Sequence, residues 1–280
     1  GTYRTALERW HIRGEEDQDA PSPDDDGELV AATHGWHRRL PAPPLGFPDQ
    51  APGAFALTYG EAEYLQGRLL SIDGPQSLFA YLADHCGPAI EAPRLWEEPT
   101  VEHAPPQIRD DVRLAQTFST ISHGANLLYN HLVARKYEQD GWTTIENPVD
   151  HYEERLDAWA DALQEAGTAR PSWREVRTRA AEQNANVLHN ASLDAFAEAW
   201  FALAAQEEPH DLWRSERAQT LVRAREISTK RLQSRFTNRG MLSRWGGSSG
   251  AGAFEFRWTQ AKQLLNDIAA GLRSDDVAVA

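Results

Sequence analysis

The chain has 280 residues, 41% of them hydrophobic, with 10 tryptophans and a formal net charge of -14 at pH 7. This composition predicts a folded protein with a sizeable core and argues against an intrinsically disordered chain. The single cysteine, Cys86, excludes an internal disulfide and a zinc site built on paired cysteines.

The sequence has no window near the ~18 consecutive apolar residues that a membrane span needs. Its N-terminus also lacks a basic and then apolar signal segment. We therefore expect a soluble, cytoplasmic protein that makes no membrane contact.

Residues 1–57 lack sustained periodicity and are predicted to form an irregular, Pro- and Asp-rich N-terminal segment. Residues 14–28 carry eight acidic residues and two prolines, which predicts a mobile acidic loop. Residues 40–48, LPAPPLGFP, are spaced by prolines and are predicted to be an extended linker held on the body by Leu45 and Phe47. A proline-rich ligand for a partner protein is the alternative.

From Thr58 onward the pattern is helical, and we predict one helical domain over residues 58–280. Thr58 and Glu61 have the spacing of a capping box. A second short helix is predicted after Pro75. A long helix is predicted from Asp110 to Tyr137, because apolar residues recur at steps of 3 and 4. These residues are Leu114, Phe118, Ile121, Ala125, Leu128 and Leu132.

Further helices are predicted over residues 149–165, 172–188, 192–206 and 211–233, with Asp211 as an N-cap. A last helix uses Leu264, Leu265, Ile268 and Leu272. Residues 254–258 alternate like a short strand, but strands do not alternate with helices as a parallel sheet requires. The predicted fold is mainly α, a bundle of about seven to eight helices with a Gly-rich loop near the C-terminus.

Positive charge is concentrated in one part of this acidic chain. Residues 214–262 contain 11 Lys and Arg residues against 3 Asp and Glu residues. Arginines can neutralise phosphates and aromatic rings can stack on bases, so this segment predicts nucleic-acid or phosphate binding. If one helix continued through the segment, Arg231, Arg235 and Arg239 would line one face. The candidate residues are Arg231, Arg235, Asn238, Arg239, Arg244, Trp245, Arg257 and Trp258.

Two alternatives remain for the basic segment. Its arginines can pair with the acidic surface of the same protein, with the tryptophans anchored in the core, or the segment can contact another protein. The loop Gly246–Gly250 lacks the lysine of a phosphate-binding P-loop and is at best a weak anion nest.

The long predicted helix carries polar residues just beside its apolar stripe. His123, Asn126, Tyr129 and Asn130 form a candidate polar site, since helical spacing brings the first, second and fourth to one flank. This flank could bind a polar ligand. The alternative is that its side chains satisfy neighbouring backbone at a helix interface, where Gly124 permits close approach.

A metal-dependent phosphoesterase is a further hypothesis. The order of four residues along the chain matches the metal-ligand pattern of His-Asp phosphohydrolases. These residues are His189, the pair His210-Asp211, and Asp267. The sequence contains no Gly-Xaa-Ser-Xaa-Gly elbow and no Walker motif, and Cys86 is predicted to be a small buried residue. We predict no catalytic residue, no metal ligand and no cofactor.

Three stretches resemble a bacterial family catalogued only as a domain of unknown function. They are residues 57–70 (LTYGEAEYLQGRLL), 118–134 (FSTISHGANLLYNHLVA) and 235–250 (RFTNRGMLSRWGGSSG), with Phe256–Trp258. The resemblance covers the central and C-terminal part of longer members. The resemblance implies that the gene lies beside genes for helicases and phospholipase-D-like nucleases in defence-type neighbourhoods. It implies no catalytic role for any residue.

The leading hypothesis is an accessory, non-catalytic protein of a prokaryotic anti-phage or DNA-directed system. It would bind nucleic acid, or a helicase or nuclease partner, through the Arg/Trp segment. A pure assembly subunit without nucleic-acid contact and the metal-dependent phosphoesterase are the alternatives.

Overall fold

The computed structural model describes residues 7–8, 10–13, 35–43, 56–72, 77–85, 87, 89–167, 170–183 and 191–274. The chain divides into two compact units: unit 1 comprises Gly1–Asp110 and Arg257–Ala280, and unit 2 comprises Asp111–Phe256. All regular elements of the described ranges are helices, so the predicted mainly α fold is confirmed. The predicted acidic loop, most of the proline-spaced linker, Cys86 and His189 lie outside the described residues.

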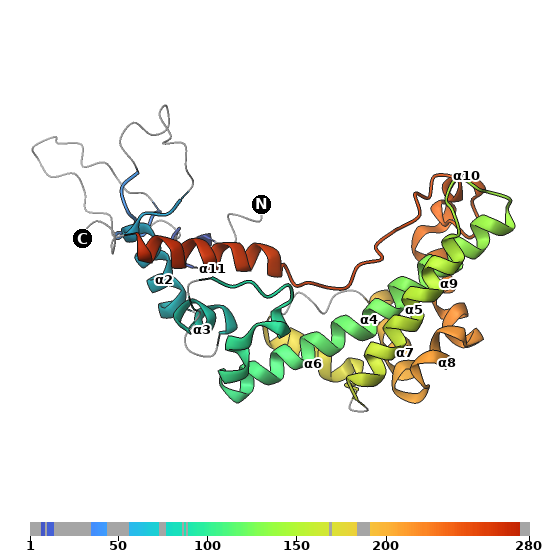
Figure 1. Cartoon of the computed structure of the whole chain (residues 1–280), viewed down its shortest axis with the longest axis horizontal. Coiled ribbons are helices and arrows are strands. Elements are labelled where there is room, and N and C mark those ends of the chain that lie inside the picture. The colour runs from blue at the N-terminus through green and yellow to red at the C-terminus, as the bar shows by residue number, and fades with distance from the viewer. Residues whose placement is uncertain are drawn as a thin grey trace, which may run out of the picture. The chain divides into compact units, whose positions relative to one another are not determined.

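In the part of unit 1 that the structure describes, three α-helices pack against one another. The first of these is α2 (Tyr59–Ile72), which is followed along the chain by α3 (Leu78–His85). Two 3-10 helices come next, η1 (Leu95–Glu97) and η2 (Pro99–His103). The C-terminal helix α11 (Trp258–Arg273) packs on α2 (Figure 1). Gly271 permits this approach, because an added Cβ would lie 2.6 Å from the Cβ of Ala62.

The predicted capping box begins α2. The Thr58 amide donates to the Glu61 carboxylate at 2.8 Å, and the Glu61 amide donates to the Thr58 hydroxyl at 3.4 Å. These bonds satisfy amides that have no partner within the helix.

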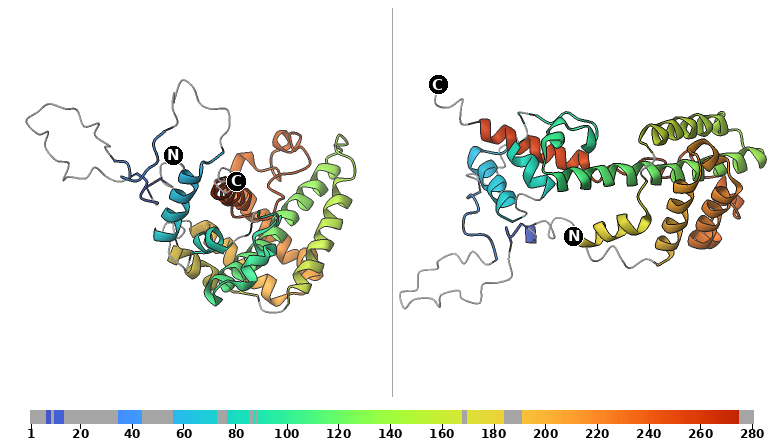
Figure 2. Two further views of the ribbon diagram at one scale, coloured as in Figure 1. Left: turned by 60° about the vertical axis from the view of Figure 1, so that its left-hand side comes forward. Right: turned by 90° about the horizontal axis from the view of Figure 1, so that it is seen from below.

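Unit 2 is organised around α4 (Pro106–Gln139), which enters the unit at Asp111. The predicted stripe is confirmed: Ile121, Ala125, Leu128 and Leu132 are buried in the core. Figure 2 shows α4 as a long straight helix with α5 alongside it. The other elements are α5 (Pro148–Glu165), α6 (Trp173–Gln183), α7 (Ala191–Gln206), α8 (Pro209–Arg214), α9 (Glu216–Lys230), η4 (Arg231–Gln233) and α10 (Arg239–Leu242).

Two tryptophans attach neighbouring helices to α4. The indole of Trp159 on α5 donates to the Thr120 carbonyl at 2.7 Å, and the indole of Trp200 on α7 donates to the next carbonyl, Ile121, at 2.8 Å. Gly124 lies against the Trp159 ring, where an added Cβ would be 2.2 Å from Cζ2. The absence of a side chain at Gly124 therefore determines how closely α5 approaches α4.

Three predicted features were wrong. The helix expected over 211–233 is divided, because Ser215 caps α9 by accepting from the Ala218 amide at 3.2 Å. The preceding helix α8 begins at Pro209, whose fixed φ suits the first helical position, so Asp211 is not its N-cap. The expected strand over 254–258 is absent, because Phe256 and Arg257 adopt positive φ values of 50° and 57°.

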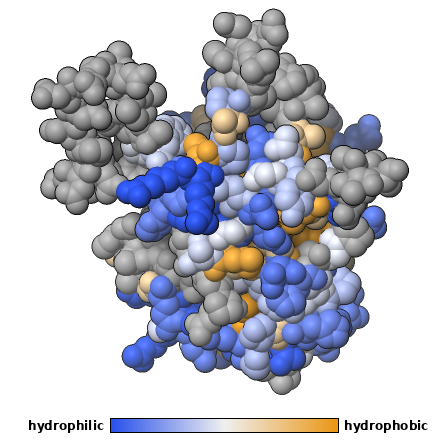
Figure 3. All heavy atoms as spheres, turned by 90° about the vertical axis from the view of Figure 1, so that its left-hand side faces the viewer, coloured by the Kyte–Doolittle hydropathy of each residue, from blue (hydrophilic) through white to orange (hydrophobic). Residues whose placement is uncertain are grey.

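On the face in Figure 3, apolar residues form separate small patches among hydrophilic ones. No helix in the described ranges is long and apolar enough to cross a membrane. In unit 2, the large apolar side chains of Leu232 and Ile227 are 87% and 40% exposed.

His131 lies in the core of unit 2, on α4. Its side chain is 1% exposed, its ring contacts Trp213 edge to face, and its Nδ1 has no hydrogen-bond partner. Burial, with a smaller contribution from the positive charge of Arg135, lowers the pKa of His131 to about 4. A hydrogen bond to the Val149 backbone opposes this shift. The imidazole is therefore neutral at neutral pH.

This histidine makes the stability of unit 2 depend on pH. The pKa of about 4 lies below the ordinary histidine value of 6.5. Between pH 4 and pH 6.5 the unfolded chain therefore binds a proton at His131 that the folded protein does not bind. Stability from this residue is complete above pH 6.5 and declines as the pH falls. We expect the wild type to lose about 2 kcal/mol of unfolding free energy between pH 7 and pH 5 that His131→Leu does not lose. Urea unfolding at both pH values measures this difference, and equal losses in the two proteins would contradict it.

Candidate functional site

The basic segment is divided between the two units. Residues up to Phe256 belong to unit 2, whereas Arg257 and Trp258 belong to unit 1. Within unit 2 the helix α9 ends at Lys230, since Arg231 adopts a φ of 49° and a ψ of -118°. The expectation that Arg231, Arg235 and Arg239 line one helix face was therefore wrong. They lie on a turn, a loop and the start of a different helix.

Both tryptophans of the segment are core residues. Trp245 is 2% exposed and packs against Tyr137 and Tyr152 in unit 2. Trp258 is 4% exposed, and its indole donates to the Ala92 carbonyl at 3.0 Å in unit 1. Neither ring has a free face for a base, so the expected Trp stacking platform is corrected to a pair of core anchors.

Asn238 has a local structural role. Its side-chain oxygen accepts from the Met241 amide at 3.1 Å and caps α10, while its side-chain amide donates to the Leu232 carbonyl at 2.7 Å. Arg239 follows at the first position of α10 and is exposed. Its guanidinium donates to the Asp140 carbonyl at 3.2 Å and lies 5.5 Å from the centre of the Trp142 ring. Asn238 thus positions the backbone that presents Arg239.

A groove of about 300 Å³ lies between the C-terminal half of α4, α9 and the loop after η4. Its lining combines apolar and cationic side chains. We name it the cationic groove; it is lined by Leu132, Arg135, Lys136, Gln139, Arg223, Ile227 and Phe236. Arg239 lies close to it, because its partner Asp140 also forms an ion pair with Lys136.

A half-buried polar cluster contacts Phe236, one of the groove residues. The Tyr129 hydroxyl accepts from Arg235 Nη1 at 2.7 Å and donates to Glu226 Oε1 at 3.3 Å. The Arg235 amide also donates to this carboxylate oxygen, at 3.4 Å. Burial raises the pKa of Tyr129, opposed by its hydrogen bond from Arg235 and reinforced by the charge of Glu226. These bonds hold the backbone of Phe236, whose ring packs edge to face on Tyr129.

The polar flank of α4 binds backbone atoms of the Gly/Ser loop. Asn130 is 0% exposed; it accepts from the Ser249 amide at 2.8 Å and donates to the Ser249 carbonyl at 2.9 Å. Asn126 donates to the Gly252 carbonyl at 3.1 Å, and His123 Nε2 lies 3.1 Å from the Ala251 carbonyl. Three of the four predicted polar residues therefore lie together along one loop, while Tyr129 joins the polar cluster that contacts Phe236.

The Gly/Ser loop is also held from α5. The Tyr152 hydroxyl donates to the Gly247 carbonyl at 2.8 Å, and Arg155 donates to the Ala251 carbonyl at 3.0 Å. The loop therefore presents carbonyl oxygens to two helices. These contacts account for the polar residues without a bound ligand.

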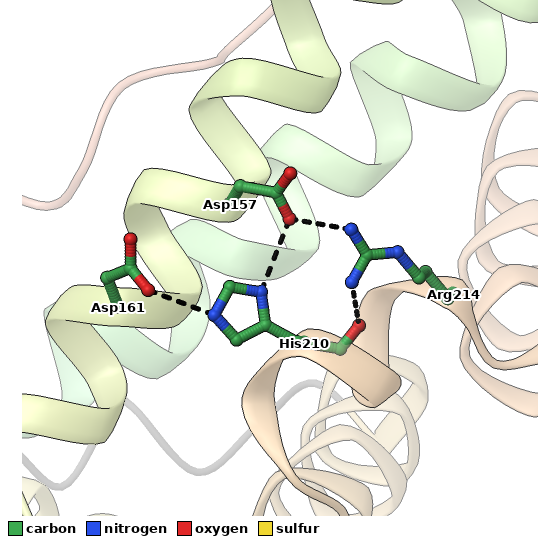
Figure 4. A network of polar contacts seen from close by, with 4 residues as sticks. All are labelled: Asp157, Asp161, His210 and Arg214. Carbon is green, nitrogen blue, oxygen red and sulfur yellow. Dashed lines mark hydrogen bonds and ion pairs between the residues drawn. The ribbon is translucent and has the colours of Figure 1, made fainter.

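His210 takes part in an exposed polar network that joins α8 to α5 (Figure 4). Its Nδ1 lies 3.3 Å from Asp157 and its Nε2 lies 2.9 Å from Asp161. Arg214 donates to the same Asp157 oxygen at 2.8 Å. Both ring nitrogens of His210 are therefore occupied by carboxylates of α5.

The residues of the phosphohydrolase hypothesis are divided between the two units. Asp267 belongs to unit 1, whereas His210 and Asp211 belong to unit 2. Across the described ranges, no group of three or more His, Cys, Asp or Glu side chains could hold a metal ion.

Sequence reasoning missed most of the groove. The residues it did not select are Arg135, Lys136, Gln139, Arg223, Ile227 and Phe236. A signal was present, because Arg135, Lys136 and Gln139 follow one another within about one turn at the end of the long helix. Only the fold shows that this turn lies beside α9.

The family of the chain follows from a comparison with protein-family models. A model described as a family of unknown function (DUF6361) matches residues 26–271. The chain belongs to this family. The DUF6361 match includes the cationic groove, the polar flank of α4 and the His210 network. No curated protein and no solved structure matches the chain significantly.

Proposed function

We propose that this DUF6361 protein is an accessory, non-catalytic protein that binds nucleic acid through the cationic groove and the exposed arginines beside it. The observation that carries this proposal is the charge of residues 217–244, which include eight Lys and Arg residues and one acidic residue. That acidic residue, Glu226, is buried and bonded to Tyr129 and Arg235. The exposed surface of this segment is therefore cationic.

Among the described residues, several cations of the groove and of residues 217–244 have no carboxylate partner. Across the described residues, no carboxylate lies within ion-pair distance of Arg135, Arg223, Lys230, Arg231 or Arg244. Arginines without an internal partner can donate to phosphate oxygens, with two parallel bonds in the favourable geometry.

The net charge of -14 does not oppose such binding at cellular salt concentration. The Debye length is about 8 Å at physiological ionic strength, so charges beyond this distance act weakly on a phosphate at the groove. The charges close to the groove therefore determine how strongly it attracts a phosphate.

The resemblance to proteins encoded beside helicases and phospholipase-D-like nucleases adds a context to the proposal. It supports an accessory role in a prokaryotic, DNA-directed or anti-phage system. In such a system this protein would hold nucleic acid while a partner enzyme acts on it.

Replacement of two exposed arginines tests the proposal. We expect Arg223→Glu combined with Arg239→Glu to weaken binding to a fluorescent oligonucleotide about 10-fold or more, because each loses a phosphate contact. Wild-type affinity should also fall steeply between about 50 and about 200 mM salt, with a shallower salt dependence for the double variant. Fluorescence anisotropy measures both effects.

The matched control changes the same charge elsewhere on unit 2. Arg174 and Arg177 are exposed residues of α6, and Arg174→Glu with Arg177→Glu should leave the affinity within about 2-fold of the wild type. Equal losses in the two double variants, or absent binding to DNA and RNA at low salt, would reject the proposal.

A protein partner is the second candidate. Leu232 in η4 is 87% exposed and follows the exposed Arg231, and arginine is enriched in protein interfaces. Co-purification with a helicase or nuclease that persists after nuclease treatment would favour this function.

A further inference from the structure

We infer that the cationic groove receives an unpaired base, so that this protein binds single-stranded nucleic acid in preference to a duplex. The inference rests on the proposed function and specifies its ligand. The inference follows from the lining of the groove, which combines apolar side chains, one aromatic ring and cationic side chains.

The apolar part of the lining suits a nucleobase. Ile227 and Phe236 supply accessible apolar surface over the buried Leu132. Proteins that bind single strands without sequence preference stack bases on aromatic rings such as that of Phe236. The Phe236 ring is held edge to face by Tyr129, with 6.0 Å between the ring centres. Because Tyr129 is itself fixed by Glu226 and Arg235, this ring has a defined orientation.

The cationic and polar part of the lining suits the phosphates and the base edge. The Arg223 guanidinium lies over the Phe236 ring, 6.0 Å from its centre. A base that stacks on this face would move the exposed Arg223 side chain aside, toward the phosphate of the same nucleotide. Arg135 lines the same groove without a carboxylate partner. The Gln139 amide offers both a donor and an acceptor to base edges of any type.

The size of the groove favours a single strand. Its volume of about 300 Å³ is at the lower end of the range for small-molecule sites. Bases of a duplex are paired within the stack and cannot enter such a recess without being flipped out, which costs a few kcal/mol. An unpaired base enters without this cost.

A comparison of three ligands tests the inference without altering the protein. The ligands are a fluorescent single strand of about 20 nucleotides, the duplex of the same sequence, and an abasic strand with the same number of phosphates. We expect the single strand to bind at least about 10-fold more tightly than either of the other two. The abasic strand separates base insertion from phosphate attraction, because it retains the charge and lacks the rings.

Variants of the apolar lining provide the second measurement. Phe236→Leu removes the ring and retains an apolar side chain, so it should weaken single-strand binding about 5-fold or more and leave abasic binding unchanged. Phe236→Tyr retains the ring and should retain the affinity. Ile227 is 40% exposed, so Ile227→Glu introduces a negative charge into the groove with little risk to folding and should also reduce single-strand binding.

The possible outcomes distinguish the two proposals. Equal affinity for the three ligands, with no effect of Phe236→Leu, would overturn base insertion and leave phosphate binding in place. Binding to none of them would overturn the proposed function as well. A preference for the single strand that Phe236→Leu abolishes and Phe236→Tyr preserves would support the inference.

Discussion

Gly124→Ala is expected to destabilise unit 2 by about 2 to 4 kcal/mol, although alanine is the better helix former. The added Cβ would lie 2.2 Å from Cζ2 of Trp159, and two more ring atoms lie within 2.7 Å. Trp159 cannot move away freely, since its indole donates to the Thr120 carbonyl at 2.7 Å. Either α5 must shift or this hydrogen bond must break. Urea unfolding followed by circular dichroism measures the loss.

Two further variants give this prediction a control. Gly67 also lies within a helix, but nothing comes within 4 Å of an added Cβ there. Gly67→Ala should therefore raise stability by about 0.5 to 1 kcal/mol through helix propensity alone. Combining Gly124→Ala with Trp159→Leu should cost less than the sum of the two single changes, because the leucine leaves room for the methyl group. Strict additivity would show that the two positions do not clash.

Asn130→Ala is expected to cost about 2 to 4 kcal/mol, because it leaves the amide and the carbonyl of Ser249 without their partner. The side chain is fully buried, so water does not readily replace it. Its third bond, from Nδ2 to the Asn126 carbonyl at 2.8 Å, orients the amide toward the loop. Hydrogen exchange at the Ser249 amide and urea unfolding measure the effect.

Asn126 provides the matched comparison, since it donates a single bond to the exposed residue Gly252. Asn126→Ala should cost about 1 kcal/mol, the usual net value of one hydrogen bond. A smaller loss for Asn130→Ala than for Asn126→Ala would contradict the view that Asn130 is the principal attachment of the loop.

Local patterns predicted the helices well. The stripe from Ile121 to Leu132 and the capping box at Thr58 depend on residues within a few positions of one another, and a single helix satisfies them. The boundaries that failed depend on local backbone geometry that the hydrophobic pattern does not report. Pro209 begins α8 two residues before the predicted start, and Ser215 caps α9 inside the helix predicted over 211–233.

The candidate site was predicted only in part. The concentration of arginine after residue 214 was visible, as was the polar flank of α4. The roles of Trp245 and Trp258 were not, because an exposed and a buried tryptophan look alike in a sequence. Because both tryptophans are buried, Phe236 is the aromatic residue of the proposed interface.

The sequence by itself therefore determined the helical class, the apolar stripe of α4 and the sign of the charge between Arg217 and Arg244, since each is a property of neighbouring residues. Only the tertiary structure decided which cations share a groove. Arg135 and Arg223 are far apart along the chain and meet because α4 and α9 pack in the same unit. The end of α9 before Arg231 decided where the following residues lie, because it places Phe236 in the lining of the groove and Arg239 beside the groove.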